Sequence, residues 1–314
     1  MSFVKRKIKI QMVLNGDTFD NGANTITLEG MRTRISVVST VGGVTPAMSK
    51  MELQVWGMKP SDLARISTLG MKMLENNPTL ISVKAGDDKG GMSLVFLGAI
   101  AFANIDYNAM PDVCLEIQAN TTYNYQIQPM AGTSYPGRVS ASTLLKAICA
   151  ACKPPLNFAD PKGFDGQLSN HAVAGSPFWQ IADICGAAGC NWTISNGTLT
   201  IWPTNTFIDD SPILVSSGRG LVGYPCYSNG GIDVVMEYNP SVMLGRKIQI
   251  QTDMPQPTAK RLSEVNKQSP TPLVSGSNGT FGISMVSHDL SSELPGGPWF
   301  TKAWVTQILA REFS

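Results

Sequence analysis

The chain has 314 residues, of which 43% are hydrophobic and only 15% are charged, and its formal net charge is +1. This length accommodates two or three domains with a well-buried core, and the near-zero charge excludes a global field that would attract nucleic acid or cationic ligands. Because soluble domains are typically about 25% charged, we expect other subunits to cover much of the surface.

No apolar run approaches the roughly 18 residues that a membrane-spanning helix needs. The N-terminus starts with charged residues and then alternates, without the apolar segment of a secretion signal. We therefore expect the protein to remain in the cytoplasm where it is made until a larger assembly carries it out. In that compartment the six cysteines are expected to be thiols without disulfides or bound metal.

Residues 1–128 are predicted to be mostly strand. Ile8, Ile10 and Met12 alternate with basic and polar residues, the period of a half-buried strand whose basic outer face is expected to be solvated. One short helix is predicted over residues 60–70, between a proline and a glycine. About seven strands with a single helix favour an antiparallel barrel or sandwich. Further strands are predicted at residues 25–28, 34–38, 51–55, 80–85, 93–104 and 113–117.

Residues 129–205 are predicted to form a small α+β module. Ser140 or Ser142 can cap a first helix, which two consecutive prolines end. A second helix has Ser176 as its cap, a proline at its first position and Gly189 as its terminator.

The second helix leads into a predicted β-hairpin. Asn196-Gly197 is a preferred two-residue turn, and it places Ile194 opposite Leu199 and Trp192 opposite Ile201. These four side chains share one face of the hairpin, so we expect that face to pack on the second helix.

Residues 206–314 return to strands, predicted at residues 213–215, 232–236, 247–251, 281–286 and 300–305. Residues 254–279 contain four prolines and many polar residues. Long loops in compact domains are usually functional or disordered, so this loop is predicted to be a partner-contacting or mobile segment that the third domain does not need in order to fold.

A glycine pattern in the third region matches the spacing of a dinucleotide-binding loop. Gly218, Gly220 and Gly223 follow a predicted strand, but the motif works only when a helix N-terminus comes next to meet the pyrophosphate. Tyr224-Pro225 follows instead. We interpret the pattern as a glycine-rich connection.

Four cysteines have a spacing that could supply thiolates to zinc. A zinc site needs turns that bring the sulfurs together, whereas Cys149, Cys152 and Cys185 fall in predicted helices. We expect these thiols, with Cys190, to act as small buried apolar groups.

Two histidines complete the candidate chemistry. His171 is predicted to lie in a loop. Ser287, His288 and Asp289 contain the residue types of a catalytic triad, but neighbouring strand residues point to opposite faces and cannot act together. The residues themselves therefore predict no catalytic, cofactor-binding or metal-binding residue, and the chain is not expected to be an enzyme.

Many short stretches, in order along the whole chain, resemble phage tail baseplate hub proteins. None is diagnostic alone, and all are strands and turns. They are Leu28-Glu29-Gly30-Met31-Arg32, Met51-Glu52-Leu53-Gln54-Val55-Trp56-Gly57-Met58, Val83-Lys84-Ala85-Gly86-Asp87-Asp88, Asn108-Ala109-Met110-Pro111-Asp112-Val113, Asn191-Trp192-Thr193-Ile194, Leu221-Val222-Gly223-Tyr224-Pro225, Tyr238-Asn239-Pro240-Ser241 and Pro295-Gly296-Gly297-Pro298.

The resemblance implies a mainly β protein (α+β overall) with two tail-tube-like antiparallel β-barrel domains, 1–128 and 206–314, flanking the α+β module at 129–205. It implies a structural virion protein: a homotrimeric ring in the tail baseplate that joins the tail tube protein to the central spike protein and contacts other baseplate (wedge) proteins. Genomic DNA would be met only in passage through the channel, and no membrane or cofactor is implied. Assembly would take place in the host cytoplasm.

Two alternatives stay open at this point. One is a tail-tip protein of a non-contractile tail. The other is a monomeric β-rich ligand-binding or enzymatic protein with its pocket in the middle module. The native mass distinguishes the ring from the monomer.

Overall fold

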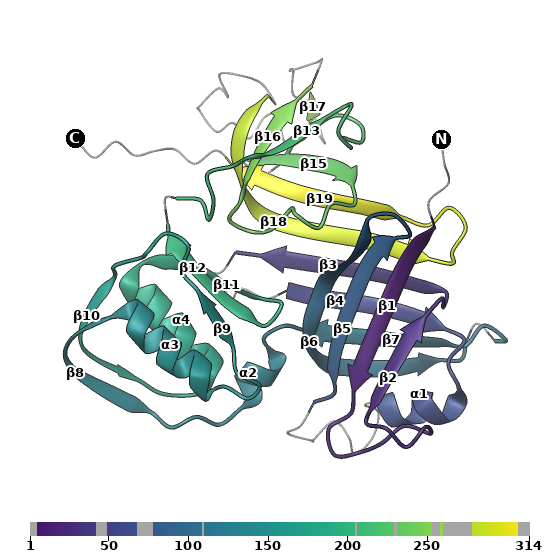
Figure 1. The fold of residues 1–314 in the computed structure, drawn as a ribbon, viewed down its shortest axis with the longest axis horizontal. Helices are drawn as coiled ribbons and strands as arrows, with labels where there is room; N and C mark the ends of the chain where they lie inside the picture. Colours follow the sequence, from purple (N-terminus) through teal and green to yellow (C-terminus); the bar gives the residue numbers. More distant parts are fainter. Residues whose placement is uncertain are drawn as a thin grey trace.

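The computed structural model describes residues 5–41, 49–67, 78–108, 110–204, 206–228, 231–252, 258–259 and 278–306. Figure 1 shows a large body of strands with a smaller helix-containing module beside it. Among these residues, no helix is long and apolar enough to cross a membrane.

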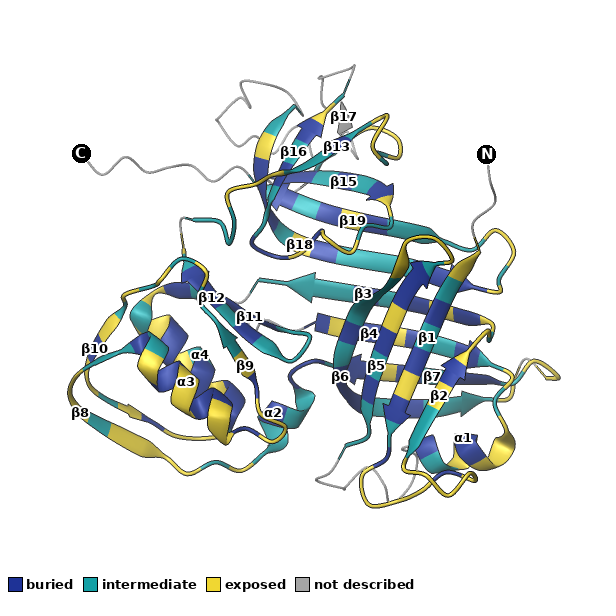
Figure 2. Ribbon diagram, in the orientation of Figure 1, coloured by how far each residue is buried: buried dark blue, intermediate teal, exposed yellow. Residues whose placement is uncertain are grey.

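The N-terminal part is built from strands that alternate between core and solvent. Ile8, Ile10 and Met12 are buried as predicted, and Figure 2 shows the alternation of buried and exposed residues along β1 and β5. The helix α1 begins at Pro60 but ends at Ile66; the predicted terminator Gly70 lies outside the described residues. The elements are β1 (Arg6–Val13), β2 (Thr25–Glu29), β3 (Thr33–Thr40), β4 (Ser49–Trp56), α1 (Pro60–Ile66), β5 (Leu80–Asp87), β6 (Gly91–Asp106) and β7 (Cys114–Asn120).

The two predicted helices of the middle module are confirmed. The side chain of Ser140, not of Ser142, caps α3, because its Oγ accepts a hydrogen bond from the Thr143 amide at 3.2 Å. Gly189 ends α4 in the left-handed conformation, with φ of 71°. Ser176 occupies the N-cap of α4 without a side-chain capping hydrogen bond. The elements are α2 (Tyr123–Ile127), β8 (Thr133–Ser140), α3 (Ala141–Ala151), β9 (Asn157–Ala159), β10 (Gln167–Val173), α4 (Pro177–Ala188), β11 (Cys190–Ser195) and β12 (Thr198–Pro203).

The predicted hairpin of the module is also confirmed. Asn196 and Gly197 both have positive φ, 51° and 74°, as a type I′ turn requires, and Ile194 pairs with Leu199. The hairpin packs on α4, where the rings of Phe178 and Trp192 lie 5.7 Å apart.

The sequence did not predict the ribbon of β8 and β10. His171 was predicted to lie in a loop, and this is wrong: it lies in β10 and pairs with Tyr135 of β8. Both strands are mostly polar and exposed, so neither has the apolar alternation that identifies a strand. They are strands because their backbones pair with each other.

The C-terminal part consists of β13 (Ile213–Ser216), β14 (Cys226–Ser228), β15 (Gly231–Glu237), β16 (Lys247–Gln251), β17 (Thr258–Ala259), β18 (Gly279–Ser292) and β19 (Trp299–Thr306). All five predicted strands are present, and the turn at residues 295–298 joins β18 to β19. Apart from the backbone of β17 and residues 278–279, the predicted loop from residue 254 to 279 lies outside the described residues.

The two strand-rich parts share one 14-stranded sheet. Its main path runs β17-β14-β15-β19-β18-β3-β4-β7-β6-β5-β1-β2, and the two parts meet where β18 pairs with β3, from Met285 opposite Thr40 to Ser292 opposite Thr33. In Figure 1 β18 lies beside β3. The mainly β, largely antiparallel class is confirmed, while the described strands pair as an open path and close neither part into a barrel.

Three hydrophobic clusters lie under these elements. The N-terminal cluster fills the space between β3-β4-β7 and the layer of β1 and β5 that crosses over them in Figure 1. The 16-residue β6 pairs with both β5 and β7 and so connects the two layers. A second cluster lies inside the module and a third among the C-terminal strands. Leu290 of β18 belongs to the N-terminal cluster.

We expect Leu290→Ala to lower the free energy of unfolding by about 2–5 kcal/mol, the usual cost of truncating a fully buried leucine. Leu290 is 0% exposed and lies in a core-facing row with Ile35, Leu53 and Ile117. Met285→Ala is the matched control on the same strand, because Met285 is 37% exposed, and it should change stability by no more than about 0.5 kcal/mol. Urea unfolding measures both, and equal effects would contradict the placement of Leu290.

Candidate assembly surface

The sheet face opposite the N-terminal core is polar. Along β3, β4, β7 and β18 the side chains alternate, so the residue next to each core position points outward. Asp289, Ser36, Glu52 and Gln118 face one another across the four strands as one outward row. Arg34, Gln54 and Glu116 form the row beside it. We call these seven residues the outer sheet face.

A hollow of about 370 Å³ lies in the outer sheet face. Gln54 Nε2 donates to Glu116 Oε1 at 3.0 Å. Asp289 Oδ1 is buried and has no hydrogen-bond partner within the described part of the chain. Three carboxylates against one guanidinium make this surface polar and weakly acidic.

The basic run of β1 lies on the other side of the N-terminal part, and its charges are compensated. Lys7 Nζ lies 2.6 Å from Asp88 and Lys9 Nζ 3.4 Å from Glu29. A hydrogen bond and the charge of Asp88 raise the pKa of Lys7. Exposed pairs of this kind contribute little to stability, but they compensate the charges of Lys7 and Lys9. This agrees with the predicted solvated face.

Arg6 attaches the start of β1 to the turn between β18 and β19. Its guanidinium Nη1 donates to the carbonyl oxygen of Gly297 at 3.2 Å, and its Cζ lies 5.5 Å from the ring centre of Trp299. Lys5 Nζ lies 2.8 Å from Glu293 in the same turn. The glycine- and proline-rich turn therefore contacts the N-terminal part directly.

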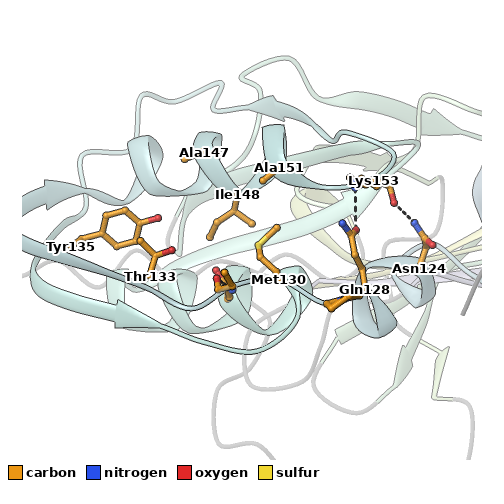
Figure 3. A pocket seen from close by; sticks show the side chains of 12 residues that line it. Asn124, Gln128, Met130, Thr133, Tyr135, Ala147, Ile148, Ala151 and Lys153 are labelled. Atoms are coloured by element: carbon orange, nitrogen blue, oxygen red, sulfur yellow. Dashed lines mark hydrogen bonds between the residues drawn. The ribbon is translucent and has the colours of Figure 1, made fainter.

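The middle module contains a cleft of about 680 Å³ between α3 and the segment that enters β8. Figure 3 shows Met130, Tyr135 and Ile148 around it. Gln128 Oε1 at one end accepts a hydrogen bond from the Lys153 amide at 3.0 Å. Gln180 Nε2 donates to the carbonyl oxygens of Ala131 and Gly175. The amides of the cleft hold the module's own backbone, and its walls offer mainly apolar contact.

The glycine pattern forms a connection between β13 and β14. The Arg219 amide donates to the Ser216 carbonyl at 2.8 Å, and Gly220 has φ of 80°. Leu221 then forms a β-bridge with Met236. The chain continues into β14 rather than a helix, so within the described part of the chain no helix N-terminus follows these glycines.

Cys149, Cys152, Cys185 and Cys190 are all buried in the core of the module. Burial raises the pKa of the Cys149 thiol to about 12 and that of Cys152 to about 11, which keeps both protonated near neutral pH. The described residues contain no group of three or more His, Cys, Asp or Glu suited to a metal ion.

We expect a maleimide at pH 7.5 to label one thiol per native chain, at Cys226. This residue is half-buried, whereas the other five cysteines are buried, and the thiolate is the reactive form. The chain in urea should label at all six. Mass spectrometry counts the adducts, and rapid native labelling of Cys149 or Cys185 would show that the module core is open.

The two histidines lie far from a triad arrangement. His171 Nε2 lies 3.0 Å from Asp183 Oδ2 on α4. His288 Nδ1 lies 2.9 Å from Thr301 Oγ1, and its ring meets the Tyr238 ring edge-on at 5.6 Å. His288 lines a crevice of about 520 Å³ where the three parts of the chain meet, whereas Asp289 lines the hollow of the outer sheet face.

We expect stability to fall as the pH is lowered from about 6.5 to about 4, in part because of His288. Burial lowers the pKa of His288 from 6.5 to about 4, so the unfolded chain binds more protons in this window. The contribution is at most about 3 kcal/mol at 1.36 kcal/mol per pKa unit. His288→Gln can keep the bond to Thr301 but cannot titrate. The difference in unfolding free energy between wild type and variant should therefore shrink from pH 7 to pH 4, and a constant difference would contradict the assignment.

The alternation within each strand's sequence showed which polar residues point outward, but not that they form one surface together. Glu52 and Gln54 alternate with apolar residues in the sequence, as do Glu116 and Gln118, which was a visible signal. Asp289 joins them only through the pairing of β18 with β3, and that register has no local signature.

Comparison with known proteins gives one family and several similar folds. The family model described as baseplate hub gp41 matches residues 62–260, more than half of the chain. A search of curated proteins found no match.

Solved structures match over nearly the whole chain at identities that show the fold alone. The tail protein from Neisseria meningitidis MC58 has a TM-score of 0.60 and 9% identity, covering 96% of both chains. The c3393 protein of E. coli, described as a type VI secretion component with similarity to T4 bacteriophage tail proteins, has a TM-score of 0.56 and 7% identity, covering 88% of this chain and 73% of that one. The 43 kDa tail protein of prophage MuSo2 from Shewanella oneidensis has a TM-score of 0.54 and 9% identity, covering 95% of this chain and 96% of that one.

Proposed function

Because this chain belongs to the baseplate hub gp41 family, we propose that three copies form a ring that joins the tail tube to the central spike of a phage tail. The role is structural and needs no cofactor. Its partners are the tail tube protein, the spike protein and other baseplate (wedge) proteins. The site of action is the baseplate of the virion, after assembly in the host cytoplasm.

The arrangement of strands supports a ring with matching symmetry. We propose domains at 1–128, 129–205 and 206–314. The three hydrophobic clusters support this division, except that Tyr125 belongs to the module's cluster and Leu290 to the N-terminal cluster. Three copies with two strand-rich domains each present six similar units. Such a ring can dock under a sixfold tube and above a threefold spike, and closed cyclic symmetry is the common solution for homo-oligomers.

The outer sheet face is the observation that carries the channel proposal. Its seven residues lie side by side across β18, β3, β4 and β7, all are polar, and three are carboxylates against one guanidinium. Proteins hold DNA by neutralising its phosphates with Lys and Arg, so a weakly acidic lining lets DNA pass without binding it. We propose that this face lines the channel.

We expect native mass measurement on purified tails, together with images of the particles, to give a ring of three copies. A stable monomer at high concentration, with no ring visible in tails, would overturn the proposal. A monomer in dilute solution is compatible with it, because the tube or the spike can be required for ring formation.

We expect the double substitution Glu52→Lys and Glu116→Lys to slow DNA ejection several-fold while tails still assemble. Added cations on the channel wall would bind the passing phosphates. Glu29→Lys is the control, because Glu29 of β2 pairs with Lys9 of β1 and lies outside the outer sheet face. Ejection is measured by fluorescence of a DNA dye after triggering. Normal ejection by the double variant would mean that this face does not line the channel.

The cleft of the middle module favours a second candidate, a monomeric ligand-binding protein with its pocket in that module. The native mass distinguishes it from the ring. The other alternative, a tail-tip protein of a non-contractile tail, is tested by finding whether the chain is present in purified contractile or non-contractile tails.

A further inference from the structure

One carboxylate in the segment between β12 and β13 bridges the middle module and the C-terminal strands. Both oxygens of Asp210 lie 3.0 Å from Lys162 Nζ. Lys162 belongs to the module, in the loop between β9 and β10. Lys247 Nζ lies 3.5 Å from the same carboxylate, and Lys247 is the first residue of β16.

The residues just before Asp210 are seated on the C-terminal strands. The Ile208 amide donates to the carbonyl oxygen of Gly245 at 2.8 Å. Arg246 Nε donates to Asp209 Oδ2, and both side chains are less than a third exposed. Lys247 Nζ also lies 4.9 Å from the ring centre of Phe207.

The backbone at Gly245 lies close to both the segment and the module. Gly245 has φ of 75°, and a Cβ there would lie 2.6 Å from Ile208 Cδ1 and 2.9 Å from Trp202 Cζ2. Trp202 is part of β12 in the module. Ile208 therefore packs at the contact between β12 of the module and the turn that leads into β16.

The exposures of the three bridging groups differ sharply. The Lys162 and Lys247 side chains are 25% and 22% exposed, whereas that of Asp210 is 81% exposed. Hydrogen bonding and the charge of Lys162, then those of Lys247, lower the pKa of Asp210. Water and salt reach this carboxylate, and at about 1 M salt charges are screened within about 3 Å.

We propose that residues 206–210 form an ionic latch that holds the α+β module against the C-terminal strands and opens at high ionic strength. Loss of the Asp210 contacts leaves the module attached through its two chain connections, the packing of Trp202 near Gly245, and the contact of its hairpin turn, where a Cβ on Gly197 would lie 3.3 Å from Leu97 Cδ2. The module then turns relative to the sheet. The latch forms within one chain, so it operates whether or not the chain assembles into a ring.

The test measures the distance between the α+β module and the C-terminal strands by pulsed electron spin resonance. Spin labels are attached at Ala150→Cys on α3 and Ser217→Cys after β13, both exposed positions, in a Cys226→Ser background. Wild type should give a narrow distance distribution at about 0.1 M salt and one at least twofold wider at about 1 M salt. Asp210→Asn should be equally wide at low salt and change little with added salt.

Asp165→Asn is the matched control. Asp165 is an exposed module carboxylate whose hydrogen-bond partner is the amide Nε2 of Gln167 in the same module, so its removal should leave the distribution narrow. A low-salt distribution for Asp210→Asn as narrow as that of wild type would overturn the latch. Equal salt broadening of wild type and Asp210→Asn would do the same.

Lys162→Gln provides a second variant in case Asp210→Asn fails to fold, which thermal unfolding reveals. It breaks only the module side of the bridge and leaves Lys247 with Asp210. It should broaden the distribution as Asp210→Asn does, and a narrow distribution in this variant would by itself rule out the latch.

Discussion

The structure depends on the pairing of β3 with β18, which brings residues 33–40 against residues 285–292. This single antiparallel register makes one sheet of two strand-rich regions and places Leu290 in the N-terminal cluster. It also brings the turn at residues 295–298 within reach of Arg6. Contacts between residues this far apart in sequence are slow to form. Leu290 can join the N-terminal cluster only after β18 has paired with β3.

The same register separates two kinds of surface. Going one residue along any of the four paired strands exchanges the apolar row of Ile35, Leu53 and Ile117 for the polar row of Ser36, Glu52 and Gln118. A slip by one residue would expose the first row and bury the second. The channel proposal and the stability of the core thus both depend on the register in which these four strands pair.

The middle module is independent in its core but not in its position. Its helices pack on the hairpin of β11 and β12 within their own cluster. Its position relative to the C-terminal strands rests instead on Lys162, Asp210, Lys247 and the close contact at Gly245. Hydrophobic burial holds the module together, whereas the bridge at Asp210, which we propose holds it against the C-terminal strands, is ionic. The two therefore respond differently to salt.

The sequence by itself determined the local structure: the strand periodicity around Ile10, a serine cap of α3 at Ser140 or Ser142, and the Asn196-Gly197 turn. Each of these depends on residues a few positions apart, whose conformational preferences act before any tertiary contact. The resemblance of ordered short motifs also identified the hub family. Only the tertiary structure decided that β8 and β10 are strands, that His171 lies in one of them, and that Asp289 joins Glu52 on one face. These features come from pairing between distant segments, and a strand's partner and register are set by packing and by backbone hydrogen bonds that no local sequence pattern encodes.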